Sequence, residues 1–274
     1  MLLSGTLIAS YPFISNRIAQ KNASVAISDY DEKVKAMENE KLDVIKEAAQ
    51  KYNEQLSAAS VRDANGENEE SGTSYVDMLG LGEGIGYIDI PKIDVNLPIY
   101  EGTDEAVLSK GVGHMEQSSY PIGGVSTHSV LTGHRGLPEA VLFTDLDKLE
   151  KGDCFYLHIL NEVLAYRVID IKVIEPDETE PFEIVKGEDF CTLVTCTPYA
   201  INTHRLLVRG VRTEYIEEEA ESRVQYQEMQ TGTIVKRLIG VWQWLAEAVI
   251  LVIGGEAVLM VIAIRRKKKQ KKDD

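Results

Sequence analysis

Short alternating runs of apolar and polar residues dominate the chain from about Gly86 to Arg212. Such runs, rich in β-branched and aromatic residues and separated by Pro and Gly, predict β-strands. The segments are GYIDIPKIDVNLPIY, THSVLTGH, CFYLHIL, LAYRVIDIKVIE, CTLVTC and THRLLVRGVRT. Only one short helical patch, near residues 140–149, interrupts them. The pattern therefore predicts a mainly β domain over residues 86–213, closed as an antiparallel barrel, which also removes exposed strand edges.

A helical pattern precedes the predicted barrel. Between residues 25 and 56, apolar residues recur at spacings of three and four among charged ones, which predicts one or two amphipathic helices within a helical region of residues 21–57. Residues 58–85 are rich in Gly, Ser, Asn and Glu and predict a connector. Residues 1–20 begin with an apolar run that lacks preceding basic residues, and we interpret them as the remnant of a signal peptide or N-terminal anchor.

The C-terminal part predicts a membrane anchor. A charged helical spacer is predicted over residues 214–237 and a transmembrane helix over 238–264, where the apolar run Leu245–Ile264 is long enough to cross a hydrocarbon layer of about 30 Å. The tail, residues 265–274, carries seven Lys or Arg and two Asp. By the positive-inside rule this tail is cytoplasmic and the barrel lies outside the cell.

Charged residues bear on the membrane helix and on the choice of partner. Glu256 favours an alternative, a buried helix with a solvated tail, because a carboxylate at mid-membrane costs about 3 kcal/mol on insertion scales. The whole chain has a formal net charge of -15 despite its basic tail. A body this acidic repels phosphates, so nucleic acid is excluded as a partner.

The segment Thr192–Gly210, TLVTCTPYAINTHRLLVRG, contains two of the groups that acyl transfer needs. Cys196 ends a predicted strand before a Thr-Pro step, where a thiolate can reach a carbonyl. Arg205 follows nine residues later on the next strand, where its guanidinium can stabilise an oxyanion. Arg209 lies an even number of residues from Arg205 and shares its face, so position alone does not choose between the two arginines.

A third group, the imidazole of His134, lies in SVLTGHRGLP, where two glycines permit a sharp turn after a strand. Taken singly, a cysteine at a strand end is more often buried, and a lone histidine is more often a surface residue. The remaining histidines have no spacing to cysteines or carboxylates that a zinc site requires, so no metal or other cofactor is predicted.

The other two cysteines are predicted to be small buried residues. Strand alternation points Cys191 and Cys196 to opposite faces, so they are poorly placed to form a disulfide with each other. A Cys154–Cys191 disulfide remains open at this point.

These segments together resemble the sortase family. The strands around Cys196, the segment LTGHRGLP and the opening GYIDIPKIDVNLPIYEGT resemble three family motifs in their order along the chain. The close Cys-to-Arg spacing and the C-terminal helix with a basic tail resemble class C, the pilus-assembling branch. The resemblance implies a sortase-type β-barrel and a cysteine transpeptidase in which Cys196 is the nucleophile, His134 the acid and base, and Arg205 the oxyanion donor. Thr195 is a candidate substrate contact.

The resemblance also implies the partners and the setting of the reaction. Cys196 would cleave an LPXTG-like sorting signal between Thr and Gly, and a pilin lysine would resolve the thioacyl enzyme, at the membrane of a Gram-positive-type cell. Two alternatives remain: attachment of surface proteins to cell-wall peptidoglycan, and a catalytically idle, membrane-tethered binding module. Class C sortases often carry a lid with an Asp-Pro-aromatic motif. Here Asp63 is the candidate lid aspartate, the proline is missing, and Tyr75 could supply the ring.

Overall fold

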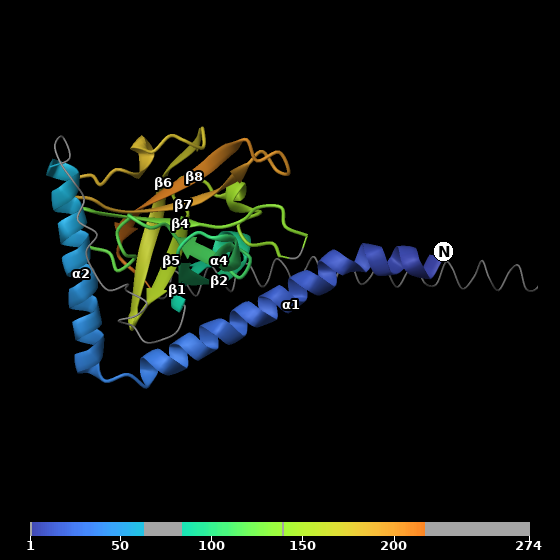
Figure 1. Cartoon of the computed structure of the whole chain (residues 1–274), viewed down its shortest axis with the longest axis horizontal. Coiled ribbons are helices and arrows are strands. Elements are labelled where there is room, and N and C mark those ends of the chain that lie inside the picture. Colours follow the sequence, from blue (N-terminus) through green and yellow to red (C-terminus); the bar gives the residue numbers. More distant parts are fainter. Residues whose placement is uncertain (1, 63–83, 139, 217–274) are drawn as a thin grey trace, which may run out of the picture. The chain divides into compact units, whose positions relative to one another are not determined.

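The computed structural model describes residues 2–62, 84–138 and 140–216. Within these residues, β-strands close into a barrel in the order β1-β2-β3-β4-β7-β8-β6-β5 (Figure 1). The strands are β1 (Gly84–Ile90), β2 (Val95–Glu101), β3 (Val112–His114), β4 (Thr127–Thr132), β5 (Cys154–Ile159), β6 (Glu162–Ile174), β7 (Asp189–Thr197) and β8 (His204–Thr213). The prediction of a closed, mainly β barrel is confirmed.

The prediction that the barrel is purely antiparallel is wrong. β2 pairs with β3 in parallel, and β4 pairs with β7 in parallel. The chain crosses from β2 to β3 through the short helix α4 (Glu105–Leu108), and from β4 to β7 through the β5–β6 hairpin. Alternation along a strand indicates which face is buried but not which neighbour the strand pairs with, so the sequence pattern could not distinguish these arrangements.

The helical elements also differ from the prediction. The patch expected near residues 140–149 contains a single 3-10 turn, η2 (Leu146–Lys148). Two further 3-10 turns are η1 (Pro91–Ile93) and η3 (Glu180–Phe182). These turns are short because each lies between strands that are already fixed in the barrel.

The N-terminal helices are confirmed and are longer than predicted. α1 (Leu2–Lys35) runs unbroken through the predicted remnant at residues 1–20, and α2 (Asn39–Arg62) continues into the predicted connector. α1 contacts β1 and β2, and α2 contacts β4. The buried hydroxyl of Tyr30 fastens α1, because it donates to the Ile85 carbonyl at 3.2 Å and accepts from the amide of Leu160 at 2.7 Å.

The main hydrophobic core fills the barrel and continues beneath the helices. It includes residues from every strand, among them Ile88, Ile99, Leu131, Phe155, Tyr166, Leu193 and Val208. Cys191 belongs to this core, while Cys154 is also buried, and all three cysteines are free thiols. The structure therefore excludes the Cys154–Cys191 disulfide.

Several predictions concern residues outside the described ranges. These are the lid candidates Asp63 and Tyr75, the transmembrane helix at 238–264 and the basic tail. Residues 214–216, the start of the predicted helical spacer, are not helical, and the rest of the spacer also lies outside the described residues. A search of the described residues finds no helix with the length and apolar character of a membrane span.

Candidate active site

The pairing of β7 with β8 brings two of the predicted residues together. Cys196 lies directly opposite Arg205 in the antiparallel register. Cross-strand partners point to the same side of a sheet, so the thiol and the guanidinium share one face. Both residues are partly exposed, since Cys196 comes at the end of β7, where the barrel wall stops.

His134 is held beside the same strand end by hydrogen bonds on both sides of it. Before it, the hydroxyl of Thr195 donates to the carbonyl of Gly133 at 2.7 Å. After it, Nη1 of Arg135 donates to the hydroxyl of Thr197 at 3.2 Å. His134 therefore lies between Gly133 and Arg135, and these two residues are hydrogen-bonded to the residues on either side of Cys196. The parallel pairing of β4 with β7 makes this possible, because both strands end at the same edge.

The turn that carries His134 requires its glycines. Gly136 has φ +78°, in the left-handed region that side chains disfavour. A Cβ on Gly133 would lie 2.8 Å from the ring of Phe143, and one on Gly136 would lie 3.1 Å from the ring of Tyr199. The amide of Phe143 also donates to the carbonyl of His134 at 3.1 Å. The predicted Gly-bounded turn is thus confirmed, with close packing as an additional reason for both glycines.

The three groups are near one another without being bonded to one another. Among the described residues, no hydrogen bond joins Sγ of Cys196 to His134 or Arg205. Nη1 of Arg205 donates to the carbonyls of Asn202 at 3.4 Å and His204 at 3.1 Å. The guanidinium has five N–H donors, so its remaining donors are available to a substrate. Catalytic hydrogen bonds are often long in unliganded enzymes and shorten on substrate binding.

The structure separates the two arginines that the sequence could not separate. Arg209 lies four residues further along β8, roughly 13 Å at the rise of a strand. Its Nη2 donates to the carbonyl of Pro181, and its guanidinium lies 5.4 Å from the ring centre of Phe190. Arg209 therefore holds the segment between β6 and β7 onto the sheet, and Arg205 is the arginine beside the cysteine.

The face that carries Cys196 continues into an apolar patch. Val130, Ile174, Val194 and Leu207 are buried there, packed against Met115 and Phe182. This outer apolar patch lies along β4, β7 and β8, and its cover comes from the same β6–β7 segment that Arg209 holds.

A buried histidine also fastens that cover. Nδ1 of His128 lies 2.9 Å from the carbonyl of Glu183, and Nε2 lies 2.8 Å from the hydroxyl of Thr192. Burial lowers the pKa of His128 to about 4, with the nearby positive charge of Arg209 acting in the same direction. The imidazole is therefore neutral at neutral pH.

The structure also shows the contacts of Thr195, which was predicted as a substrate contact, and of Glu105, which was not predicted. Thr195 is only 1% exposed and supports the His134 turn from inside the barrel, so it does not face the surface where Cys196 lies. Glu105 was not predicted, although its Oε2 lies 3.1 Å from Nε2 of His134. It is 29 positions away in sequence, and no motif connects them. The part played by Arg135 could have been suspected from its position beside the histidine.

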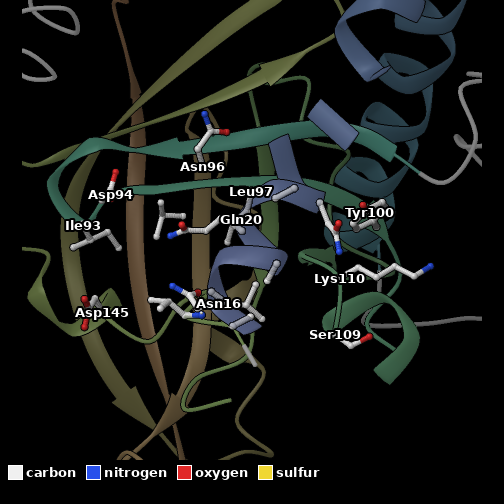
Figure 2. A pocket seen from close by; sticks show the side chains of 17 residues that line it. Asn16, Gln20, Ile93, Asp94, Asn96, Leu97, Tyr100, Ser109, Lys110 and Asp145 are labelled. Carbon is white, nitrogen blue, oxygen red and sulfur yellow. Dashed lines mark hydrogen bonds between the residues drawn. The ribbon is translucent and has the colours of Figure 1, made fainter. Parts of the chain in front are cut away.

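A cavity in the described part of the chain lies away from these residues. It measures about 520 Å³ and lies between α1 and β2 (Figure 2). Asn16 and Gln20 of α1 line one side, and Asn96 and Tyr100 of β2 line another. None of the three predicted catalytic residues lines it. The described residues also contain no group of three or more His, Cys, Asp or Glu side chains placed to hold a metal ion.

A closed barrel carries cysteine, arginine and histidine at adjoining strand ends, an arrangement with the groups that thiol-based acyl transfer requires. The family model of the sortase domain matches residues 88–213. The solved structure of Streptococcus pneumoniae Sortase C is 47% identical, covering 69% of this chain and 96% of that one with a TM-score of 0.62. A lid mutant of Streptococcus agalactiae Sortase C1 is 45% identical, covering 70% and 99%, with a TM-score of 0.65.

The chain therefore belongs to the sortase family, and its match to sortase C structures identifies it with class C. Among curated relatives, Sortase D of Bacillus subtilis is 35% identical over 119 residues, which are 43% of this chain and 57% of the relative. The chain thus spans a little over half the length of that relative.

Proposed function

We propose that this protein is a cysteine transpeptidase that cleaves an LPXTG-like sorting signal between Thr and Gly and joins the signal's acyl group to a lysine of a pilin. The observation that carries the proposal is the placement of Cys196 opposite Arg205, with the His134 turn bonded to both neighbours of the cysteine. Similarity to class C structures supports the choice of reaction, since the Streptococcus pneumoniae enzyme is reported in connection with pilin substrate specificity.

The chemistry follows from the residues. The Cys196 thiol gives its proton to His134 as Sγ attacks the Thr carbonyl, and free donors of Arg205 bind the resulting oxyanion. When the C–N bond to Gly breaks, the imidazolium returns its proton to the departing amine. A lysine amine then attacks the thioester and passes its surplus proton to the imidazole; as the C–S bond breaks and the isopeptide bond forms, the imidazolium returns that proton to the sulfur and regenerates the thiol.

The proposal includes a location for the reaction. The barrel works outside the cell, tethered through the C-terminal span at residues 238–264, and Asp63 is the candidate residue of a lid. Both features rest on the sequence pattern and on the resemblance to class C. The partners are pilin or surface proteins with LPXTG-like signals.

The test uses the full chain in detergent with an LPXTG-containing peptide and a pilin domain. We expect a thioacyl adduct on Cys196 by mass spectrometry and a new isopeptide bond to a pilin lysine. Product formed only with a peptidoglycan-type amine would instead indicate wall anchoring. Absence of any adduct on Cys196, with the protein folded, would indicate an idle binding module and overturn the proposal.

A further inference from the structure

The imidazole of His134 has a carboxylate partner that no family motif supplied. Oε2 of Glu105 lies 3.1 Å from Nε2 of His134. The imidazole is 23% exposed, whereas the Glu105 side chain is 79% exposed. The carboxylate is thus the more exposed member of the pair.

The backbone that presents Glu105 is well fixed. Glu105 is the first residue of α4, and the side chain of Asp104 caps that helix by accepting from the amide of Val107 at 2.9 Å. α4 packs closely on β3, since a Cβ on Gly113 would lie 2.9 Å from Leu108. β3 in turn pairs with β4, the strand that leads to His134. Packing, rather than the ion pair itself, therefore sets the distance.

The contact determines which ring nitrogen can exchange protons with the thiol. A neutral imidazole has one N–H donor and one acceptor nitrogen. The Glu105 carboxylate accepts from Nε2–H, which leaves Nδ1 as the acceptor. We propose that Glu105 is a positioning residue that holds His134 in this tautomer, so that Nδ1 takes the proton of Cys196. This inference rests on the function proposed above.

The expected effect is on rate, because an exposed ion pair contributes only about 0–1 kcal/mol to stability. The charged or titratable groups on the elements around the imidazole are Glu105 of α4, Cys196 of β7 and Arg205 of β8. Arg135, its neighbour in sequence, is turned to Asp147. Glu105 is thus the carboxylate bonded to this ring.

The chain offers a matched control. Oε1 of Glu175 lies 3.2 Å from Nε2 of His204, an exposed Glu–His pair of the same kind and close to the same strand ends. His204 pairs with Thr197 and has no part in the proposed chemistry. Comparing Glu105→Ala with Glu175→Ala therefore separates a specific effect on His134 from the general loss of a surface carboxylate.

The kinetic experiment measures kcat and KM for peptide cleavage by the full chain across pH. For Glu105→Ala we expect kcat to fall roughly tenfold, part of what a positioned acid–base group supplies, with KM unchanged. Glu105→Asp should recover part of the rate. Equal profiles for Glu105→Ala and Glu175→Ala would overturn the proposal.

A spectroscopic experiment tests the tautomer without relying on turnover. Imidazole ¹⁵N chemical shifts of His134, assigned by comparison with His134→Gln, should report protonated Nε2 in the unmodified chain and a mixture of tautomers in Glu105→Ala. A ring that keeps the same tautomer in both would overturn the proposal. If the unmodified chain forms no adduct on Cys196, the proposed function fails, and the ¹⁵N result still decides separately whether Glu105 sets the tautomer of His134.

Discussion

The two faces of β7 place the same side chain in opposite chemical environments. Cys191 lies on the inner face, fully buried in the barrel core. Burial, with the charge of Asp189 adding to it, raises the pKa of its thiol well above the ordinary value. Cys196 lies five residues later on the outer face, partly exposed and opposite Arg205. A thiol reacts as the thiolate, so the face of the strand decides which cysteine is available for chemistry.

The inner face nevertheless supports the outer one. Thr195 points into the barrel, and its hydroxyl holds the carbonyl of Gly133, the residue before His134. Further along the strand, Asp189 accepts from the hydroxyl of Tyr166 at 2.9 Å and from the amide of Gly124 at 2.9 Å. The buried polar groups of β7 thus fix loops at both ends of the strand, and one of these loops carries the histidine.

Replacing each of the two cysteines separately by alanine should give the largest difference in peptide cleavage. Cys196→Ala should lower peptide cleavage by on the order of 10³-fold or more, because no nucleophile remains. Cys191→Ala removes one buried sulfur and should leave kcat within about threefold while lowering stability by about 1 kcal/mol. Turnover assays and adduct mass spectrometry check both. A folded Cys191→Ala variant that forms no adduct would break the comparison.

Alanine substitutions of the two arginines of β8 should give the next largest difference in kcat. Arg205→Ala should lower kcat by about 10²–10³-fold, the usual cost of losing an oxyanion donor. Arg209→Ala loosens the β6–β7 segment at Pro181, so we expect a raised KM and a lower unfolding midpoint with kcat largely retained. Steady-state kinetics and thermal unfolding separate these outcomes. If instead Arg209→Ala abolishes turnover and Arg205→Ala does not, the oxyanion role belongs to Arg209.

Much of this contrast is readable from the sequence, because a strand has a period of two. The odd separation of Cys191 and Cys196 predicts opposite faces, and the core position of Cys191 confirms it. Gly133 and Gly136 likewise indicate the His134 turn, since a glycine is needed where backbone and rings approach closely. Local pattern therefore predicts strand faces and turns.

Contacts between distant segments could not be predicted in the same way. The parallel pairing of β4 with β7 brings the His134 turn to the cysteine, yet it depends on the course of the whole barrel. Glu105 reaches His134 because α4 lies on β3, and Arg209 is distinguished from Arg205 by its contact with Pro181 and by the register that sets Arg205 opposite Cys196. Each of these depends on tertiary packing, which leaves no periodic signal in the sequence.

The outer face contains a titratable group whose effect appears in stability. Burial lowers the pKa of His128 to about 4, so the unfolded chain binds more protons between that value and about 6.5. The free energy of unfolding should therefore rise with pH across this window, by on the order of 3 kcal/mol from this group. Burial has the opposite consequence for Asp89, whose raised pKa of about 6 makes stability fall as pH rises toward that value.

Denaturant unfolding of the unmodified chain and of His128→Gln at pH 4.5 and pH 7 isolates the histidine, since Asp89 contributes equally to both proteins. We expect a smaller gain in stability between the two pH values for His128→Gln. The same gain in both proteins would show that His128 does not titrate in this window.

The smallest difference in kcat is expected between substitutions of two buried threonines on opposite faces of β7. Thr195→Val removes the hydroxyl that holds Gly133, and Thr192→Val removes the hydroxyl beside Nε2 of His128. Each leaves a buried polar group without its partner, so each should cost about 1–2 kcal/mol of unfolding free energy. Only Thr195→Val loosens the His134 turn, and we expect it to lower kcat roughly threefold, since small displacements of a catalytic group slow the reaction. Equal loss of kcat in both variants, measured at matched stability, would mean that the inner face does not position the histidine separately from the rest of the barrel.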